Sequence, residues 1–173
     1  IVLGRKNESN FRHDFSLPCK YFQWSNPAES LPPDQAMDVD AVIHLMGEPL
    51  DGRRWTERKK LEFRSSRIKS TRNMVYAIKG ALGRIKVFLT ASAIGIYGEG
   101  GETTFTEKSK IGDTFLAKLC HDWEQEASKS TCRNAQLRFG IVLANDSRAL
   151  KKMLPVFENG FGGPLSSGNQ WMS

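Results

Sequence analysis

The stretch of residues 86–98 constrains the fold of this chain most, because an apolar run passes there directly into small and hydroxyl-bearing residues. The apolar part, residues 87–89, is typical of a central parallel strand that is covered on both faces. Residues 90–95 then leave the backbone open to close approach, and open α/β sheets place their ligands at this end of a strand. The pattern therefore predicts a strand that leads into a binding site, although an ordinary strand-to-loop exit is the alternative.

The composition is that of a globular chain: 173 residues, 39% hydrophobic and 25% charged, with no apolar run long enough to cross a membrane. Cys19, Cys120 and Cys132 are odd in number and lack CxxC spacing, which argues against a disulfide framework and a structural zinc site. We therefore expect no metal and a reducing compartment, the cytoplasm or the stroma or matrix of an organelle. The strand-like first residues favour a sequence cut from a longer one, so a missing targeting signal carries no information.

Strand and helix patterns alternate along the chain. Apolar runs predict strands at residues 1–3, 20–24, 40–46, 87–89 and 136–143, and the strand at 40–46 is expected to be buried. Periodic apolar residues predict helices at residues 56–82 and 149–158, and a third that follows Asp113 as its cap. Residues 7–38 and 99–113 are predicted to be rich in loops. This order predicts an α/β fold with a doubly wound parallel sheet.

The longest predicted helix carries an apolar face and a strong positive charge. Its apolar face consists of Leu61, Ile68, Val75, Ile78 and Leu82. Eight basic residues lie between Arg53 and Lys69, against the two acidic residues Glu57 and Glu62. A charge run on an amphipathic helix is usually solvated, and few aromatic residues are interleaved here, so nucleic-acid binding is the weaker interpretation.

The turn after the first predicted strand is basic, with Arg5 beside Lys6 and no carboxylate before Glu8. In dinucleotide-binding folds an acidic residue at the end of the second strand prefers a free ribose 2′-hydroxyl, whereas arginine accommodates a 2′-phosphate. If residues 1–3 form that strand, the turn predicts NADP rather than NAD. A solvated basic loop is the alternative.

Two histidines, His44 and His13, are candidates for functional groups. His44 lies in the strand predicted at residues 40–46, and His13 lies in a polar region. Neither has a serine, cysteine or carboxylate partner at a recognisable spacing. We therefore expect a structural role for His44 and a surface position for His13.

Several longer motifs point to one family. They occupy residues 42–48, 53–56, 66–67 with Thr71, 92–98, 123–124, 138–143, 152–155, 160–165 and 168–173. Together they resemble the atypical extended short-chain dehydrogenase/reductases known as SDR39U1-like or epimerase family proteins. The resemblance implies an NAD(P)-binding Rossmann fold of the extended type, truncated at both ends. It implies a first strand, glycine-rich loop and first helix before Ile1, and a substrate-binding part that continues beyond Ser173.

The resemblance also implies a division of the chain and a set of cofactor-binding residues. Residues 1–148 are expected to form a partial NADP-binding Rossmann domain, and residues 149–173 to begin the substrate-binding portion. The expected cofactor-binding residues are Gly4, Arg5, Lys6, Leu45, Met46, Gly47, Glu62, Arg67, Ser92 and Cys120. We further expect the Arg67 guanidinium to reach the cofactor pocket and to be oriented by Glu62.

One departure from the family pattern concerns catalysis. Short-chain reductases use a Tyr-x-x-x-Lys pair, in which the tyrosine transfers a proton. Anchored on Glu124, the corresponding residues are Leu116 and Cys120, and a shift by one residue gives Phe115 and Leu119; none of these is the expected proton donor. The resemblance thus implies an NADP(H)-binding, epimerase-like or oxidoreductase-like protein whose catalytic residues, substrate and oligomeric state are unknown. The alternative is a non-catalytic cofactor-binding protein that acts through protein partners, for example in cell or organelle division.

Overall fold

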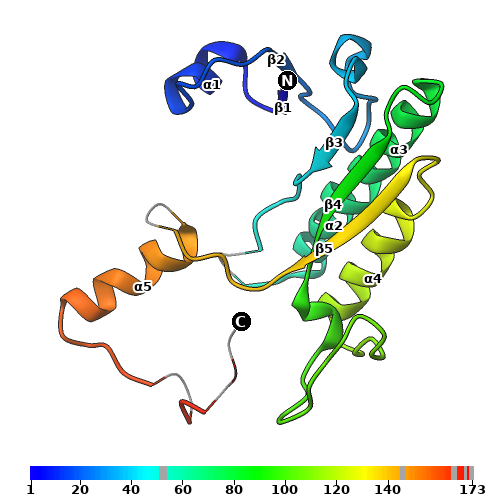
Figure 1. The fold of residues 1–173 in the computed structure, drawn as a ribbon. Helices are drawn as coiled ribbons and strands as arrows, with labels where there is room; N and C mark the ends of the chain where they lie inside the picture. The colour runs from blue at the N-terminus through cyan, green and yellow to red at the C-terminus, as the bar shows by residue number, and fades with distance from the viewer. Residues whose placement is uncertain (51–53, 145–146, 165–166, 170, 172–173) are drawn as a thin grey trace.

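The computed structural model of the chain describes residues 1–50, 54–144, 147–164, 167–169 and 171. Within these ranges the strands are parallel and form two sheets (Figure 1). Strand β1 (Val2–Gly4) pairs with β2 (Tyr21–Gln23), and β4 (Val87–Ala93) lies between β3 (Ala41–His44) and β5 (Arg133–Phe139). The predicted α/β class with a parallel sheet is confirmed. The sheet is divided because no described strand joins the free edge of β1 to that of β3.

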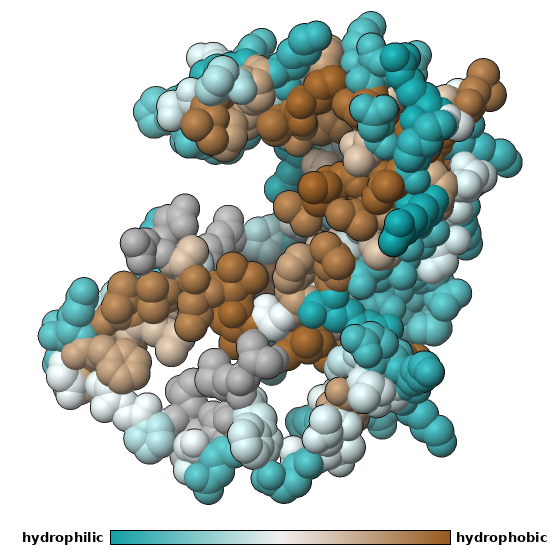
Figure 2. All heavy atoms as spheres, in the orientation of Figure 1, coloured by the Kyte–Doolittle hydropathy of each residue, from teal (hydrophilic) through white to brown (hydrophobic). Residues whose placement is uncertain are grey.

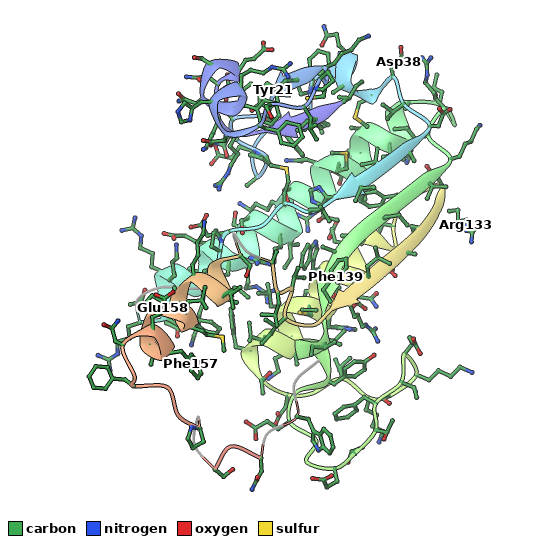
Figure 3. The ribbon with its side chains drawn as sticks, turned by 60° about the vertical axis from the view of Figure 1, so that its left-hand side comes forward. Tyr21, Asp38, Arg133, Phe139, Phe157 and Glu158 are labelled. Carbon is green, nitrogen blue, oxygen red and sulfur yellow. The ribbon has the colours of Figure 1, made fainter. Side chains whose placement is uncertain are left out.

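Helices cover one face of the three-stranded sheet. They are α2 (Glu57–Arg64), a π-helical turn (Ser65–Lys69), α3 (Ser70–Gly80) and α4 (Phe115–Ala127). Short 3₁₀ turns lie at Asp34–Met37 and Ile94–Tyr97. Helix α1 (Glu8–Asp14) lies beside β2, whereas α5 (Arg148–Glu158) lies apart from the sheet, as the positions of Phe157 and Phe139 show (Figure 3).

The two faces of the three-stranded sheet differ sharply. Phe88, Thr90 and Ser92 of the central strand point toward the helices and are at most 4% exposed. On the opposite face, Ile43 is 64% and Phe139 is 43% exposed, and hydrophobic residues gather on the visible side of the molecule (Figure 2). The expectation that the strand at residues 40–46 is buried is therefore wrong for its outer face, because the described helices pack on one side only.

A hydrophobic cluster joins the two sheets. Its buried members are Trp24, Met37, Met74, Val75, Ile78, Ile85, Phe88 and Ala127. Leu3 of β1 and Val42 of β3 pack against this cluster from the two sheets. The ends of β1 and β3 are therefore held near one another without strand pairing between them.

The long helix predicted over residues 56–82 exists, but its apolar face differs from the prediction. Val75 and Ile78 are buried, whereas Leu61 is 66% and Leu82 is 93% exposed. The π-helical turn at Ser65–Lys69 inserts an extra residue, which rotates the residues before it relative to those after it. A regular helical period therefore cannot describe both halves. Leu82 is exposed for another reason, because it lies beyond the end of α3 at Gly80 with a φ of +49°.

Helix α4 carries the predicted apolar stripe, with Leu119, Cys120 and Trp123 buried against the core. Its cap differs from the prediction. Thr114, not Asp113, is the N-cap, since its extended backbone lets its hydroxyl accept a hydrogen bond from the amide of Ala117 at 3.1 Å.

Other boundaries differ at the ends of elements. Strand β5 begins earlier and ends earlier than the predicted range of 136–143, and Val142 and Leu143 are each 64% exposed beyond it. Helix α1 lies in the region predicted to be rich in loops; the Asn7 side chain caps it by accepting from the Asn10 amide at 2.9 Å. Helix α5 matches its predicted range closely. No helix in the described part of the chain is long and apolar enough to span a bilayer.

Candidate functional site

A cavity of about 350 Å³ opens where three parallel strands end. Arg5 follows β1, residues 25–29 follow β2, and residues 46–48 follow β3; Glu62, Ser65 and Ser66 close the fourth side from the helix. Carboxyl ends of parallel strands are where open α/β sheets bind ligands. Four of the predicted site residues, Arg5, Met46, Gly47 and Glu62, therefore meet in one cavity, although they are separated by up to 57 positions in the sequence.

The π-helical turn shapes the wall of this cavity. The Ser66 hydroxyl accepts a hydrogen bond from the Glu48 amide at 2.9 Å, and Arg67 donates from Nη1 to the Glu48 carbonyl at 2.9 Å. π-Helical turns often occur at functional sites because they redirect side chains. Here the turn fixes the backbone at Glu48 from both its amide and its carbonyl.

Arg67 lies behind the wall rather than in it. It is not among the residues that line the cavity, and its guanidinium carbon lies 5.4 Å from the centre of the Trp123 ring. A Cβ placed on Gly47 would come within 3.0 Å of that guanidinium carbon, so glycine permits the close approach. Burial lowers the pKa of Arg67, although arginine stays protonated in proteins. The described partners of Glu62 are Arg58 and Lys59, so the expected orientation of Arg67 by Glu62 is not observed.

Ion pairs surround the rim of the cavity. Arg5 lies 3.5 Å from Glu48, and Lys59 lies 3.0 Å from both Glu48 and Glu62. Hydrogen bonds to Glu62 and then to Glu48 raise the pKa of Lys59, and the bond from Lys59 lowers the pKa of Glu62. The cation at the end of β1 therefore already has a carboxylate partner. Glu48 and Lys59 were not among the predicted site residues; the position of Glu48, directly after Gly47 at the end of a strand, was the available signal.

The remaining predicted residues of the basic turn serve other contacts. Lys6 pairs with Asp14 of α1 and does not line the cavity. A Cβ placed on Gly4 would lie 2.6 Å from the hydroxyl of Tyr21, which donates to the Lys6 carbonyl at 2.5 Å. Glycine at position 4 is therefore required by the packing of Tyr21. Leu45 is 65% exposed and is not among the cavity-lining residues.

Ser92 belongs to a second, buried polar cluster. Its hydroxyl donates to Glu124 at 2.6 Å, and Arg138 donates two hydrogen bonds to the same carboxylate at 2.9 and 2.8 Å. Arg138 also donates to the Tyr97 hydroxyl at 2.8 Å. Burial alone would raise the pKa of Glu124, but the bonds from Arg138 and Ser92 outweigh it and lower this pKa. The cluster joins β4, α4 and β5.

Cys120 lies close to this cluster and is 6% exposed. Burial raises the pKa of its thiol, so the thiol is protonated near neutral pH. Leu116, one turn earlier, lies beside Gly95, since a Cβ placed on that glycine would be 3.9 Å from the Leu116 Cβ. The helix therefore presents an apolar side chain and a neutral thiol toward the end of β4.

The two histidines occupy the expected kinds of position. His44 is 2% exposed, with Nε2 at 3.3 Å from the Ser70 hydroxyl, and burial lowers its pKa to about 4. It is therefore neutral near pH 7 and packs in the core. His13 is exposed and contacts Asp14. Among the described residues, no three His, Cys, Asp or Glu side chains converge on a possible metal position.

Many of the basic residues of the long helix have carboxylate partners. Arg58 pairs with Glu62, Lys60 with Glu57 and Arg64 with Asp122. Arg53 lies outside the described residues. The paired charges fit the interpretation of a solvated helix face better than that of a nucleic-acid surface.

Comparison with known proteins gives one family. Residues 2–141 match the NAD dependent epimerase/dehydratase family. The chloroplastic SDR39U1 homolog of Arabidopsis thaliana is 40% identical over 137 residues, which are 77% of this chain and 39% of that protein. The epimerase family protein YfhF of Bacillus subtilis is 37% identical over 158 residues, 88% of this chain and 51% of that protein. The chain thus spans about half the length of these relatives, or less.

A solved structure extends the likeness to nearly the whole chain. The crystal structure of the human epimerase family protein SDR39U1 (isoform 2) with NADPH matches with a TM-score of 0.78 and 28% identity, over 98% of this chain and 55% of that chain. The resemblance to SDR39U1-like proteins is therefore confirmed.

Proposed function

This chain belongs to the NAD-dependent epimerase/dehydratase family, and we propose that it forms the NADP(H)-binding part of an epimerase-like protein. The proposal rests on the cavity at the strand ends, where Arg5 follows β1. An acidic residue at this position would favour a free 2′-hydroxyl, whereas arginine accommodates a 2′-phosphate. The human neighbour solved with NADPH supports the same cofactor.

The donor set of the cavity fits the adenosine end of such a cofactor. Arg5 supplies a cation for a 2′-phosphate, Ser25 and Ser65 supply hydroxyls, and Met46 and Pro27 supply apolar surface for a base. Gly47 keeps the wall flat, and Arg67 holds that wall from behind through the Glu48 carbonyl. When bound, NADP(H) would supply a hydride donor or acceptor. Gly4, Lys6, Leu45, Ser92 and Cys120 have no contact with this cavity that supports a direct role at the adenosine end.

We also propose that residues 1–148 are the cofactor-binding part and that residues 149–173 begin the substrate-binding portion. Support comes from α5, whose Met153, Leu154 and Phe157 are 38–57% exposed and offer apolar surface to further polypeptide. The family match, which ends at residue 141, agrees with a change of role near this point.

A non-catalytic, cofactor-binding role is the second candidate. Leu116 and Cys120, or Phe115 and Leu119 in the neighbouring register, occupy the expected positions of the Tyr-x-x-x-Lys pair. The Ser92 hydroxyl donates to Glu124. None of these groups is available to move a proton near neutral pH. The chain would then act through protein partners, for example in division of a cell or organelle.

Fluorescence titration of the full-length protein with NADPH and NADH tests the first proposal. We expect NADPH to bind at least about tenfold more tightly, the scale of one charge-assisted contact. Equal binding, or no binding, would contradict the NADP assignment. Assays of the same preparation with nucleotide-sugars and small carbonyl compounds then separate the two candidates, since steady oxidation of NADPH contradicts a purely binding role.

A further inference from the structure

Glu48 is placed so that each of its two carboxylate oxygens has its own cation. Oε2 lies 3.5 Å from Nη1 of Arg5, and Oε1 lies 3.0 Å from Nζ of Lys59. Arg5 and Glu48 both line the cavity. The guanidinium that the proposed function assigns to a 2′-phosphate is therefore held by a carboxylate of the same cavity.

The contact between Arg5 and Glu48 is weak enough for a ligand to replace it. The Arg5 side chain is 57% exposed and that of Glu48 is 29% exposed, so water screens the pair and its energy is small. A phosphate monoester carries more charge than a carboxylate and accepts two parallel hydrogen bonds from arginine. A ligand 2′-phosphate can therefore replace Glu48 as the ion-pair partner of Arg5.

Release of Arg5 does not leave Glu48 unpaired. Lys59 stays on the other carboxylate oxygen, and its second partner Glu62 holds the lysine at 3.0 Å. The backbone of Glu48 is fixed by Ser66 and Arg67, so its position does not depend on Arg5. Glu48 therefore keeps a cation partner and a fixed backbone whether Arg5 pairs with it or with a ligand phosphate.

We propose that Glu48 is a specificity-determining residue of this cavity, which holds Arg5 until a phosphate monoester on the ligand displaces it. The inference rests on the proposed function and adds a residue to it. A ligand with a free 2′-hydroxyl leaves the Arg5–Glu48 pair in place, and a carboxylate near a ribose hydroxyl accepts its hydrogen bond. Glu48 thus lowers affinity for the phosphorylated ligand and does not lower it for the unphosphorylated one.

The test compares two nucleotides that differ only in the 2′-phosphate, 2′,5′-ADP and 5′-AMP, by calorimetric titration of the full-length protein. Glu48→Gln should tighten binding of 2′,5′-ADP by about two- to fivefold, the range expected for loss of one exposed ion pair. Binding of 5′-AMP should stay the same or weaken. In an Arg5→Met background, Glu48→Gln should no longer tighten binding of 2′,5′-ADP.

Glu57→Gln is the matched control, because it removes the same charge from the neighbouring helix, where Glu57 pairs with Lys60 outside the cavity. An equal gain in Glu57→Gln, or a gain from Glu48→Gln that persists without Arg5, would overturn the role of Glu48 and leave the NADP proposal standing. Equal binding of both nucleotides by the wild-type protein would overturn the proposed 2′-phosphate preference, and this inference with it.

Discussion

Two charge networks lie at the carboxyl ends of the parallel strands, and they differ in how far water reaches them. The inner network is the buried polar cluster around Glu124. In it, Arg138 donates two hydrogen bonds to Glu124, and the two side chains are 22% and 12% exposed. In the cavity network, Arg5 and Glu48 approach to only 3.5 Å with side chains 57% and 29% exposed. The first joins three elements of the fold, and the second borders an open cavity. The same chemical pair is therefore shielded from water in one network and screened by water in the other.

The inner network should show the largest effect when it is broken. Replacing Glu124 with Gln leaves the Arg138 guanidinium facing an amide NH₂ group in a poorly hydrated site. We expect the free energy of unfolding of the full-length protein to fall by about 3 kcal/mol, the lower end of the range for half-broken buried pairs. Urea denaturation measures it. Asp122→Asn, on the same helix but in a pair that is about 40% exposed, should cost less than about 1 kcal/mol, and equal losses would remove the distinction.

Arg67 lies between the two networks and should show an intermediate effect. Its guanidinium packs on Trp123, which precedes Glu124 of the inner network on α4. It also donates a hydrogen bond to the Glu48 carbonyl in the cavity wall. Arg67→Ala should weaken NADPH binding by about tenfold, since one charge-assisted hydrogen bond that fixes the wall is lost. Lys60→Ala, which removes a cation paired outside the cavity, is the control in the same fluorescence titration. A similar small change in both variants would show that Arg67 has no part in the site.

The cavity network should contribute least to stability. Glu48→Gln should lower the free energy of unfolding by less than about 1 kcal/mol, and the difference should shrink as salt is raised from 0.1 to about 1 M, because an exposed pair is screened. The measurement is urea denaturation at the two salt concentrations. A loss as large as that for Glu124→Gln would mean that the cavity pair is a structural pair as well.

The sequence predicted the positions of the strands and helices better than the burial of their side chains. Strands β1, β2 and β3 and helices α4 and α5 lie close to their predicted positions. Apolar runs and the spacing of apolar residues indicate directly which side chains are buried. The error at Leu61 has a local cause, the π-helical turn, which no hydrophobic period reveals. Leu82 is exposed because α3 ends at Gly80 and Leu82 lies beyond that end with a φ of +49°. The error at Ile43 has a distant cause, the lack of a described helix over that face.

The predicted site residues fall into two groups in the structure. Arg5, Met46, Gly47 and Glu62 were found from motif positions and meet in one cavity, whereas Ser92 and Cys120 were found by the same reasoning and lie with the inner network. Glycine at position 4 was predicted to contact the cofactor, and the structure shows that the packing of Tyr21 also requires it. A motif position identifies the strand end on which a residue lies, but not the neighbour that its side chain contacts.

By itself, the sequence determined the alternation of strands and helices, the family and the basic residue at the end of the first strand, since these depend on neighbours along the chain. Only the tertiary structure decided which charges are paired. Glu48 pairs with Arg5, 43 positions away, and Glu124 pairs with Arg138, 14 positions away, through the parallel register of the strands and the helices packed on them. The strength of such a pair depends on the water around it, and exposure is a property of the packed molecule rather than of the chain.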